Sequence, residues 1–178
     1  MIKKVIKMGH LKWAIFSSLA LGIILSCRHE ILLTNPYPSL KELSAALLEA
    51  AQENSLEKWQ KLLISREEFR EHIYPYLPEA KGPGKVSEED YWEWVSIDTD
   101  KARKKLFALL KGREIISFEV KNPTKVLRQG RYKILRDIPL VVRLKTESGE
   151  ESLESREILK AVIEARGGYK LWNSLFEG

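Results

Sequence analysis

The sequence predicts an α+β domain in which helices come first and antiparallel strands follow. Between residues 40 and 110, apolar side chains recur at the spacing of a helix with one buried face. From about residue 116 onward, apolar and polar residues alternate, as they do in a half-buried strand. We therefore expect a single α+β domain over residues 39–178, preceded by two segments of a different kind.

The first 26 residues have the composition of an export signal. Residues 1–12 carry four lysines and no acidic residue, and residues 13–25 form an uncharged apolar run. A helix of that length spans about 20 Å, which is shorter than the roughly 30 Å hydrocarbon core of a membrane. The short core and the basic start are typical of a cleaved signal peptide. The alternatives are an uncleaved signal anchor and a buried apolar helix.

The sequence Ile24-Leu25-Ser26-Cys27 follows the apolar run directly and resembles the bacterial lipobox. This resemblance implies cleavage between Ser26 and Cys27, and a diacylglyceryl group on the Cys27 thiol. Two or more acyl chains are enough for stable membrane anchoring. Residues 27–38 contain two prolines and no helical period, so we expect a tether there. Arg28 replaces the Asp that retains lipoproteins in the inner membrane of enteric bacteria, which favours an outer membrane where the cell has one.

Serine residues mark the expected starts of the first three helices. Ser39 and Ser65 each have a glutamate three positions later, which is the spacing of a capping box, and Ser55 is a simple N-cap. The first helix should run to about Glu53. The third should end at residues 75–78, because the two prolines there cannot continue a helix.

We expect a loop over residues 79–85, where Gly and Pro are frequent, and then two separate helices. The first of the two starts at Ser87 and is one or two turns long. The second starts at Asp98 or Thr99. It ends near Gly112, since glycine suits the position just after a helix C-terminus.

The second half should form strands. In the first strand Ile116, Phe118 and Val120 should face inward, and residues 122–130 should be a turn-rich connection. In residues 138–144 every second side chain is apolar and should again face inward. The dipeptide Ser148-Gly149 then marks a reversal of the chain.

Residues 157–165 (EILKAVIEA) fit two structures. Their Ala, Glu and Lys content favours a helix. As a strand, the same segment would place Leu159, Ala161 and Ile163 inward. We interpret it as a strand, because Gly167-Gly168 followed by Tyr-Lys-Leu-Trp is typical of a hairpin turn into a final aromatic strand over residues 169–176.

The order of these elements resembles the cone-shaped α+β fold of nuclear transport factor two-like and polyketide-cyclase-like proteins. The segment Ile163–Trp172 (IEARGGYKLW) carries most of the resemblance, together with residues 39–63, 115–120 and 138–145. The resemblance implies a strongly bent antiparallel sheet wrapped around N-terminal helices, with an apolar pocket at its open end. Members of that family include isomerases, cyclases, dehydratases and non-catalytic domains, so the fold alone does not decide the function.

Charge and residue types argue against several classes of function. Four of the 30 Lys and Arg lie in the first 26 residues, which leaves 26 basic against 25 acidic residues, without the basic excess of a nucleic-acid-binding domain. After residue 26 the only histidines are His29 and His72, and Cys27 is the single cysteine, so we expect no metal and no cofactor. The sequence has neither a phosphate-binding glycine loop nor a nucleophile elbow.

Six aromatic residues are the candidate lining of a ligand pocket: Tyr74, Tyr76, Tyr91, Trp92, Trp94 and Trp172. Their alternative role is core packing. We expect a lipid-anchored protein of the bacterial envelope, able to form a homodimer, whose domain binds a small apolar molecule or a partner protein without catalysis. The alternatives are an acid–base isomerase, cyclase or dehydratase acting in the cone, and a structural or dimerising envelope adaptor.

Overall fold

The computed structural model describes Ile31 and Leu33–Trp172. The expected signal peptide, the cleavage site at Ser26 and Cys27, and residues 173–178 lie outside the described residues. The described part belongs to one packed unit that starts at Ile31. Among the helices that the structure describes, none has the length and apolar character needed to span a membrane.

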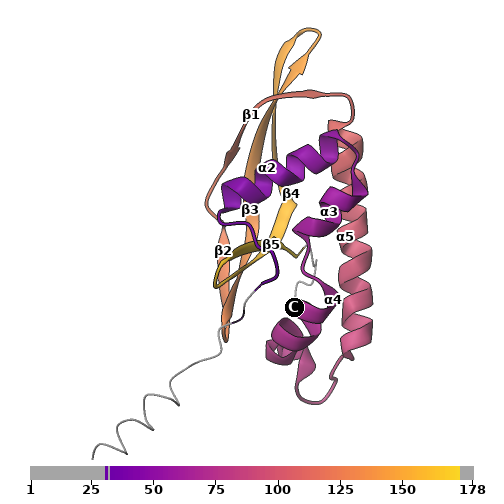
Figure 1. Cartoon of the computed structure of the whole chain (residues 1–178), viewed down its shortest axis with the longest axis vertical. Helices are drawn as coiled ribbons and strands as arrows, with labels where there is room; N and C mark the ends of the chain where they lie inside the picture. Colours follow the sequence, from indigo (N-terminus) through magenta and orange to yellow (C-terminus); the bar gives the residue numbers. More distant parts are fainter. Residues whose placement is uncertain (1–30, 32, 173–178) are drawn as a thin grey trace, which may run out of the picture. The chain divides into compact units, whose positions relative to one another are not determined.

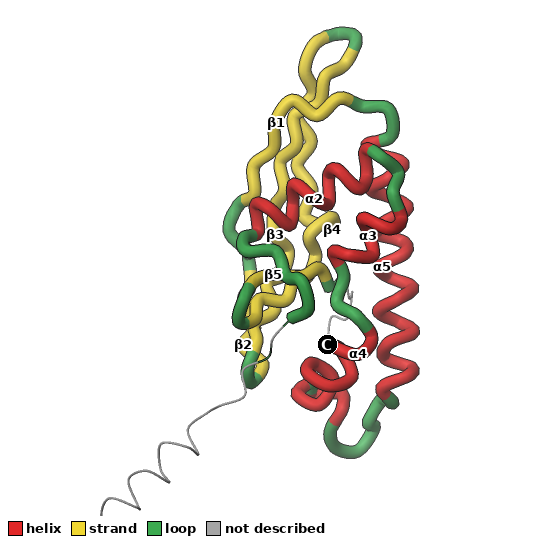
Figure 2. Tube along the Cα trace, in the orientation of Figure 1, coloured by secondary structure: helices red, strands yellow, loops and turns green. Residues whose placement is uncertain are grey.

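Three serine-capped helices open the domain (Figures 1 and 2). Their bounds are α2 Leu40–Gln52, α3 Leu56–Leu62 and α4 Arg66–Glu68. All three expected N-caps are confirmed: Ser39, Ser55 and Ser65 each accept a hydrogen bond from the backbone three residues on. The third helix continues as a π-helical turn over Phe69–Ile73 and ends in 3-10 turns that contain the prolines.

Helix α5, Glu88–Leu110, is one continuous helix, so the expected break at Asp98 or Thr99 is wrong. Its start at Ser87 is confirmed, and Gly112 follows its C-terminus with a positive φ of 71°. Asp98 does not cap a helix start but lies 3.6 Å from the Lys101 ammonium one turn later. Asp98 is therefore tolerated in mid-helix, because the ion pair with Lys101 compensates its charge.

The second half forms an antiparallel sheet that curls strongly into a half-barrel (Figures 1 and 2). Its strands are β1 Glu114–Val120, β2 Lys125–Gln129, β3 Tyr132–Thr146, β4 Gly149–Ala165 and β5 Gly168–Leu171. The order is β1-β3-β4-β5, and β2 pairs with the first part of β3. Helices before a strongly bent antiparallel sheet confirm the expected α+β class.

The long hairpin of β3 and β4 changes its register at Pro139. Ile138 pairs with Leu159, but Leu140 pairs with Ser155, so β4 contains extra residues at this point. Such a bulge bends the strand and increases its twist. Asp137, with a φ of 50°, lies next to the bulge. Strand β2 pairs with the part of β3 before this irregularity, and β1 pairs with the part after it.

Two expectations about the strands are wrong. Residues 125–129 form strand β2 rather than part of a turn-rich connection. Ile116 is 45% exposed, and the neighbouring Ile115 packs against the core instead. The cause is a shift in the β1–β3 register between Ile115 and Ser117, which moves the alternation by one residue.

The strand interpretation of residues 157–165 is confirmed, since they form the second half of β4. Leu159, Ala161 and Ile163 are buried, but so is Val162 between them. Both faces of this half of β4 are therefore covered. Apolar residues on both faces break the simple alternation of a half-buried strand, which is why the sequence of residues 157–165 also fitted a helix. The final hairpin at Gly167-Gly168 is also confirmed.

The segment before α2 packs against the rest of the domain. Ile31 and Leu33 are buried. Tyr37 exchanges two backbone hydrogen bonds with Tyr169 of β5, at 3.0 and 2.8 Å. Residues 31 and 33–38 are therefore part of the packed domain, and residues 27–30 of the expected tether lie outside the described residues.

Gly168 is the position where this packing leaves no space for a side chain. A Cβ atom there would lie 2.1 Å from the Tyr37 carbonyl oxygen, and the φ of Gly168 is +146°. We expect Gly168→Ala to lower the free energy of unfolding by more than the about 1–3 kcal/mol that backbone strain alone costs, because the added Cβ atom also collides with the Tyr37 carbonyl oxygen; urea denaturation measures the loss. Gly149→Ala is the control, because Gly149 has a φ of +133° with nothing within 4 Å. Equal losses in the two variants would contradict the role of the contact with Tyr37.

Candidate functional site

An aromatic cluster centred on Phe69 lies between the helices and the sheet. The Phe69 ring is 5.3 Å from that of Trp92, 5.6 Å from Tyr91 and 6.4 Å from Trp172, measured between centroids. Phe69 is fully buried. The π-helical turn after α4, helix α5 and the end of β5 therefore meet at one group of rings.

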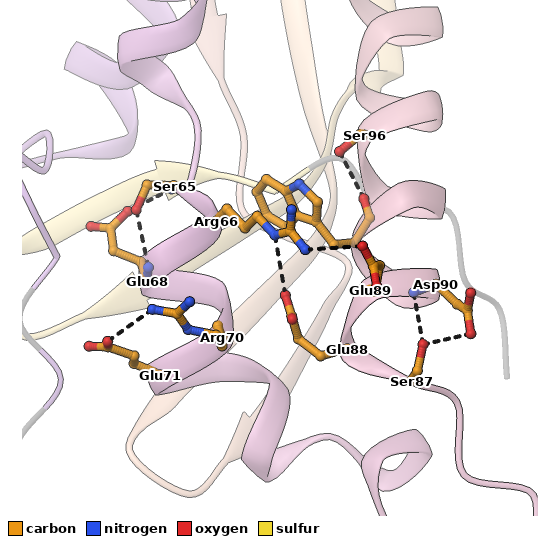
Figure 3. Close-up of polar contacts among 11 residues, drawn as sticks. Ser65, Arg66, Glu68, Arg70, Glu71, Ser87, Glu88, Glu89, Asp90 and Ser96 are labelled. Atoms are coloured by element: carbon orange, nitrogen blue, oxygen red, sulfur yellow. Dashed lines mark hydrogen bonds and ion pairs between the residues drawn. The ribbon is translucent and has the colours of Figure 1, made fainter.

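Polar contacts hold the two helix starts that position these rings (Figure 3). The Arg66 guanidinium at the start of α4 lies 3.6 Å from a carboxylate oxygen of Glu88 and 3.8 Å from one of Glu89, both in the first turn of α5. Ser87 accepts a hydrogen bond from the Asp90 amide and caps that turn. Since these charges are partly exposed, they fix orientation more than they add stability.

The six predicted pocket residues divide into two groups. Tyr91, Trp92 and Trp172 line cavities beside the Phe69 cluster. The other three line neither of the two cavities described next. The Tyr74 hydroxyl donates to the Val86 carbonyl oxygen at 2.6 Å, Tyr76 packs edge-on to Tyr132, and Trp94 is 38% exposed on α5.

The first cavity, here called the helix-side cavity, lies between α3 and α5 and has a volume of about 200 Å³. Three indole rings form much of its wall, those of Trp59, Trp92 and Trp172. Asp100 and Arg103 stand among its polar residues as an ion pair with an N–O distance of 2.6 Å. The cavity is thus mostly apolar with a charged pair at one edge.

The second cavity, here called the sheet-side cavity, has a volume of about 210 Å³ and a more polar lining. Leu127, Ile134 and Trp172 supply apolar walls, and Lys125 and Arg136 supply positive charge. Glu79 lines it too, and its Oε2 atom is buried without a hydrogen-bond partner among the described residues.

Trp172 separates the two cavities and is 4% exposed. Its indole Nε1–H is buried and has no hydrogen-bond partner among the described residues. A buried donor without an acceptor costs about 1–3 kcal/mol. This donor is therefore the clearest point at which an added hydrogen-bond acceptor would stabilise the protein.

A buried ion pair, which the sequence did not reveal, lies between Glu68 and Lys170. Lys170 Nζ is 2.9 Å from Glu68 Oε2, and both side chains are almost fully buried. Glu68 also accepts hydrogen bonds from the backbone amides of Ser65 and Thr34. Burial alone would raise the pKa of Glu68, but these hydrogen bonds outweigh it and leave the pKa below its usual value.

The Glu68–Lys170 pair joins three parts of the chain: the segment before α2, the start of α4, and β5. The only sequence signal for it was the capping box, which correctly placed Glu68 at the third helical position. Neither member lines the helix-side or the sheet-side cavity. We therefore assign this pair a structural role.

The chain is thus an α+β protein with a half-barrel sheet and two small cavities that share one tryptophan. No protein-family model, curated protein or solved structure matches it. Among residues 31 and 33–172, no group of three His, Cys, Asp or Glu side chains is arranged to hold a metal ion. His72 lies half-buried in the π-helical turn and lines neither cavity.

Proposed function

We propose that this protein is a bacterial envelope lipoprotein, anchored through Cys27, whose domain binds a small apolar molecule in the helix-side cavity. The basic start, the apolar run and the lipobox-like sequence before Cys27 support the anchor. The bent antiparallel sheet behind N-terminal helices supports the resemblance to nuclear transport factor two-like proteins.

The observation that carries the binding proposal is a cavity walled by three indole rings, one of which, that of Trp172, has a buried N–H without a hydrogen-bond partner among the described residues. An apolar molecule with one hydrogen-bond acceptor would satisfy this donor and cover the rings. Pockets for drug-sized ligands measure roughly 300–1,000 Å³. The cavity of about 200 Å³ therefore suits a smaller molecule, or one end of a longer chain.

Acid–base catalysis has weaker support, because it needs an ionisable group with a shifted pKa in the cavity. Hydrogen bonds from Lys104 and Arg103 lower the pKa of Asp100. Its carboxylate therefore stays ionised and bound to these two cations. Burial raises the pKa of Tyr132, but its hydroxyl donates to the Ile73 carbonyl oxygen, and it lines neither cavity. These groups are poor candidates for proton transfer to a bound molecule.

Replacing Cys27 by serine tests the anchor. We expect Cys27→Ser to lose membrane association in the host, because a hydroxyl does not take the place of the thiol that carries the lipid. Cell fractionation measures the loss, and mass spectrometry of the N-terminal peptide identifies the lipid on the wild-type protein. His29→Ser, two positions away, is the control and should remain in the membrane. Normal retention of Cys27→Ser would contradict the proposal.

Filling the helix-side cavity tests the binding site. We expect 1-octanol, an apolar chain with one acceptor oxygen, to change the tryptophan fluorescence of the wild-type protein in a saturable way. Ser96→Phe places a ring in the lining of the cavity and should abolish this change. Ala108→Phe is the control, since Ala108 is exposed on α5 and lines neither cavity. Unchanged binding by Ser96→Phe would rule out this cavity.

A further inference from the structure

The sheet-side cavity contains a buried carboxylate oxygen that accepts no hydrogen bond from the described residues. This atom is Glu79 Oε2. A second buried polar atom of the same kind, Trp172 Nε1, belongs to a residue that lines the same cavity. Buried polar atoms in native proteins are nearly always hydrogen-bonded, so two such atoms in one lining indicate a site for a bound molecule. A molecule that satisfies Glu79 must donate a hydrogen bond.

The turn that carries Glu79 is fixed by its own contacts. Glu79 lies in the 3-10 turn Pro78–Ala80, and its carbonyl oxygen accepts a hydrogen bond from the Val86 amide at 3.0 Å. Leu77, directly before this turn, is 3% exposed and lines the same cavity. The carboxylate therefore reaches the cavity from a backbone position that the fold holds in place.

The β2–β3 hairpin supplies another part of the lining. Leu127 pairs with Ile134, and Lys125 is two residues from Leu127, so all three lie on one face of the hairpin. Lys125 is exposed, and no hydrogen bond or ion pair joins its ammonium to another described residue. Arg136 also lines the cavity, but it takes part in a further interaction, so we assign it no role. The hairpin thus offers apolar side chains and one available ammonium group.

The charged groups of the two cavities differ in how they are paired. In the helix-side cavity Asp100 and Arg103 bind each other at 2.6 Å. In the sheet-side cavity Glu79 Oε2 and the Lys125 ammonium have no such partner within the described part of the chain. Two opposite charges that do not neutralise each other are complementary to a ligand that carries both charges.

We infer that the sheet-side cavity binds a free α-amino acid with an apolar side chain. The ligand ammonium donates to Glu79 Oε2, because charge-assisted hydrogen bonds are the strong ones. The ligand carboxylate lies near the Lys125 ammonium, and the ligand side chain covers Leu127, Ile134 and Trp172. Pockets for drug-sized ligands measure roughly 300–1,000 Å³. The cavity of about 210 Å³ therefore suits a ligand as small as an amino acid.

This site is separate from the one in the proposed function. It lies in the other cavity, takes a charged ligand instead of an apolar one, and does not depend on a lipid at Cys27. It also does not require the Trp172 N–H, which we assign to the ligand of the helix-side cavity. The two proposals can therefore fail independently.

Leucine and two analogues, each lacking one charged group, test the inference. The protein is purified from its host, dialysed exhaustively and titrated in a calorimeter. We expect saturable binding of leucine. 4-Methylpentanoate, which lacks the ammonium, should bind about tenfold more weakly or worse, the loss of one hydrogen bond to a charged group. 3-Methylbutylamine, which lacks the carboxylate, should bind severalfold more weakly, because solvent screens the exposed Lys125.

Two substitutions identify the groups that bind the ligand. Glu79→Gln should weaken leucine about tenfold but should not weaken 4-methylpentanoate. Lys125→Met should weaken leucine severalfold but should not weaken 3-methylbutylamine. Glu67→Gln and Lys85→Met are the matched controls, since both residues are exposed and line neither cavity, and they should bind leucine as the wild-type protein does.

The Ser96→Phe variant distinguishes the two cavities. It should lose the response to 1-octanol and keep the affinity for leucine, because Ser96 lines only the helix-side cavity. Loss of leucine binding in Ser96→Phe would place leucine in the helix-side cavity and overturn the inference. Absence of leucine binding to the wild-type protein, or an analogue that binds as tightly as leucine, would overturn it as well. None of these results would affect the anchor or the binding of 1-octanol.

Discussion

Replacing Lys170 by alanine is expected to lower the free energy of unfolding by about 3–5 kcal/mol. The substitution leaves the Glu68 carboxylate buried among apolar groups with its two backbone amide donors but without a counter-charge. The loss should be far larger than that of an exposed ion pair, because desolvation of an unpaired charge is not recovered from solvent. Urea denaturation followed by circular dichroism measures it.

Lys61→Ala is the matched control for Lys170→Ala. Lys61 and Glu57 form an ion pair with an N–O distance of 2.6 Å, but their side chains are 67% and 79% exposed. Exposed pairs of this kind contribute little to stability, because solvent screens the two charges. If the two alanine variants lost similar stability, the Glu68–Lys170 pair would not be buried as the structure has it.

Acid should reduce the difference between wild-type protein and Lys170→Ala. The folded-state pKa of Glu68 is lowered, so its contribution to stability is present above the unfolded pKa of about 4.3 and is lost as the pH falls through the folded value. Once Glu68 is protonated in both proteins, removing Lys170 no longer leaves a buried carboxylate without a counter-charge. We therefore expect the gap in unfolding free energy to narrow below about pH 4, as measured by denaturation at a series of pH values. A gap independent of pH would contradict the ionic origin of the effect.

Local signals were enough to predict the starts of the helices. The serine caps at Ser39, Ser55, Ser65 and Ser87 depend on hydrogen bonds that span three residues, so the sequence contains both partners. The chain reversal at Gly149 and the final hairpin at Gly167-Gly168 likewise depend on residues that are close together in the sequence. The prediction of an α+β domain followed from these signals together with the change of period.

The wrong expectations about the strands concern features that depend on distant residues. The inward side of β1 is set by a register shift against β3, and β2 is a strand because residues 132–136 pair with it. The burial of Lys170 depends on Glu68, far away in the chain. The sequence does not show which distant residues will pair, because only the fold brings them together. The cavities at Trp172 are of the same kind, since helices and sheet each supply part of the wall.

Phe69→Ala is the second substitution with a large expected effect. Truncating a fully buried phenylalanine costs about 3–5 kcal/mol, through lost burial and through the cavity left behind. Phe69 also contacts the rings of Tyr91, Trp92 and Trp172, and each such pair contributes about 0.5–1.5 kcal/mol beyond its buried area. We therefore expect a loss near the upper end of that range, measured by urea denaturation.

Trp94→Ala separates the central role of Phe69 from a general effect of losing an aromatic ring. Trp94 is 38% exposed, with a ring contact to Tyr91 at 6.3 Å, so its truncation should cost much less. Because Phe69 contacts two rings that line the helix-side cavity, Phe69→Ala should also weaken the near-ultraviolet dichroism and the response to 1-octanol together. A stability loss with an unchanged octanol response would show that the cavity keeps its shape without Phe69, and that the cluster supports the fold but not the site.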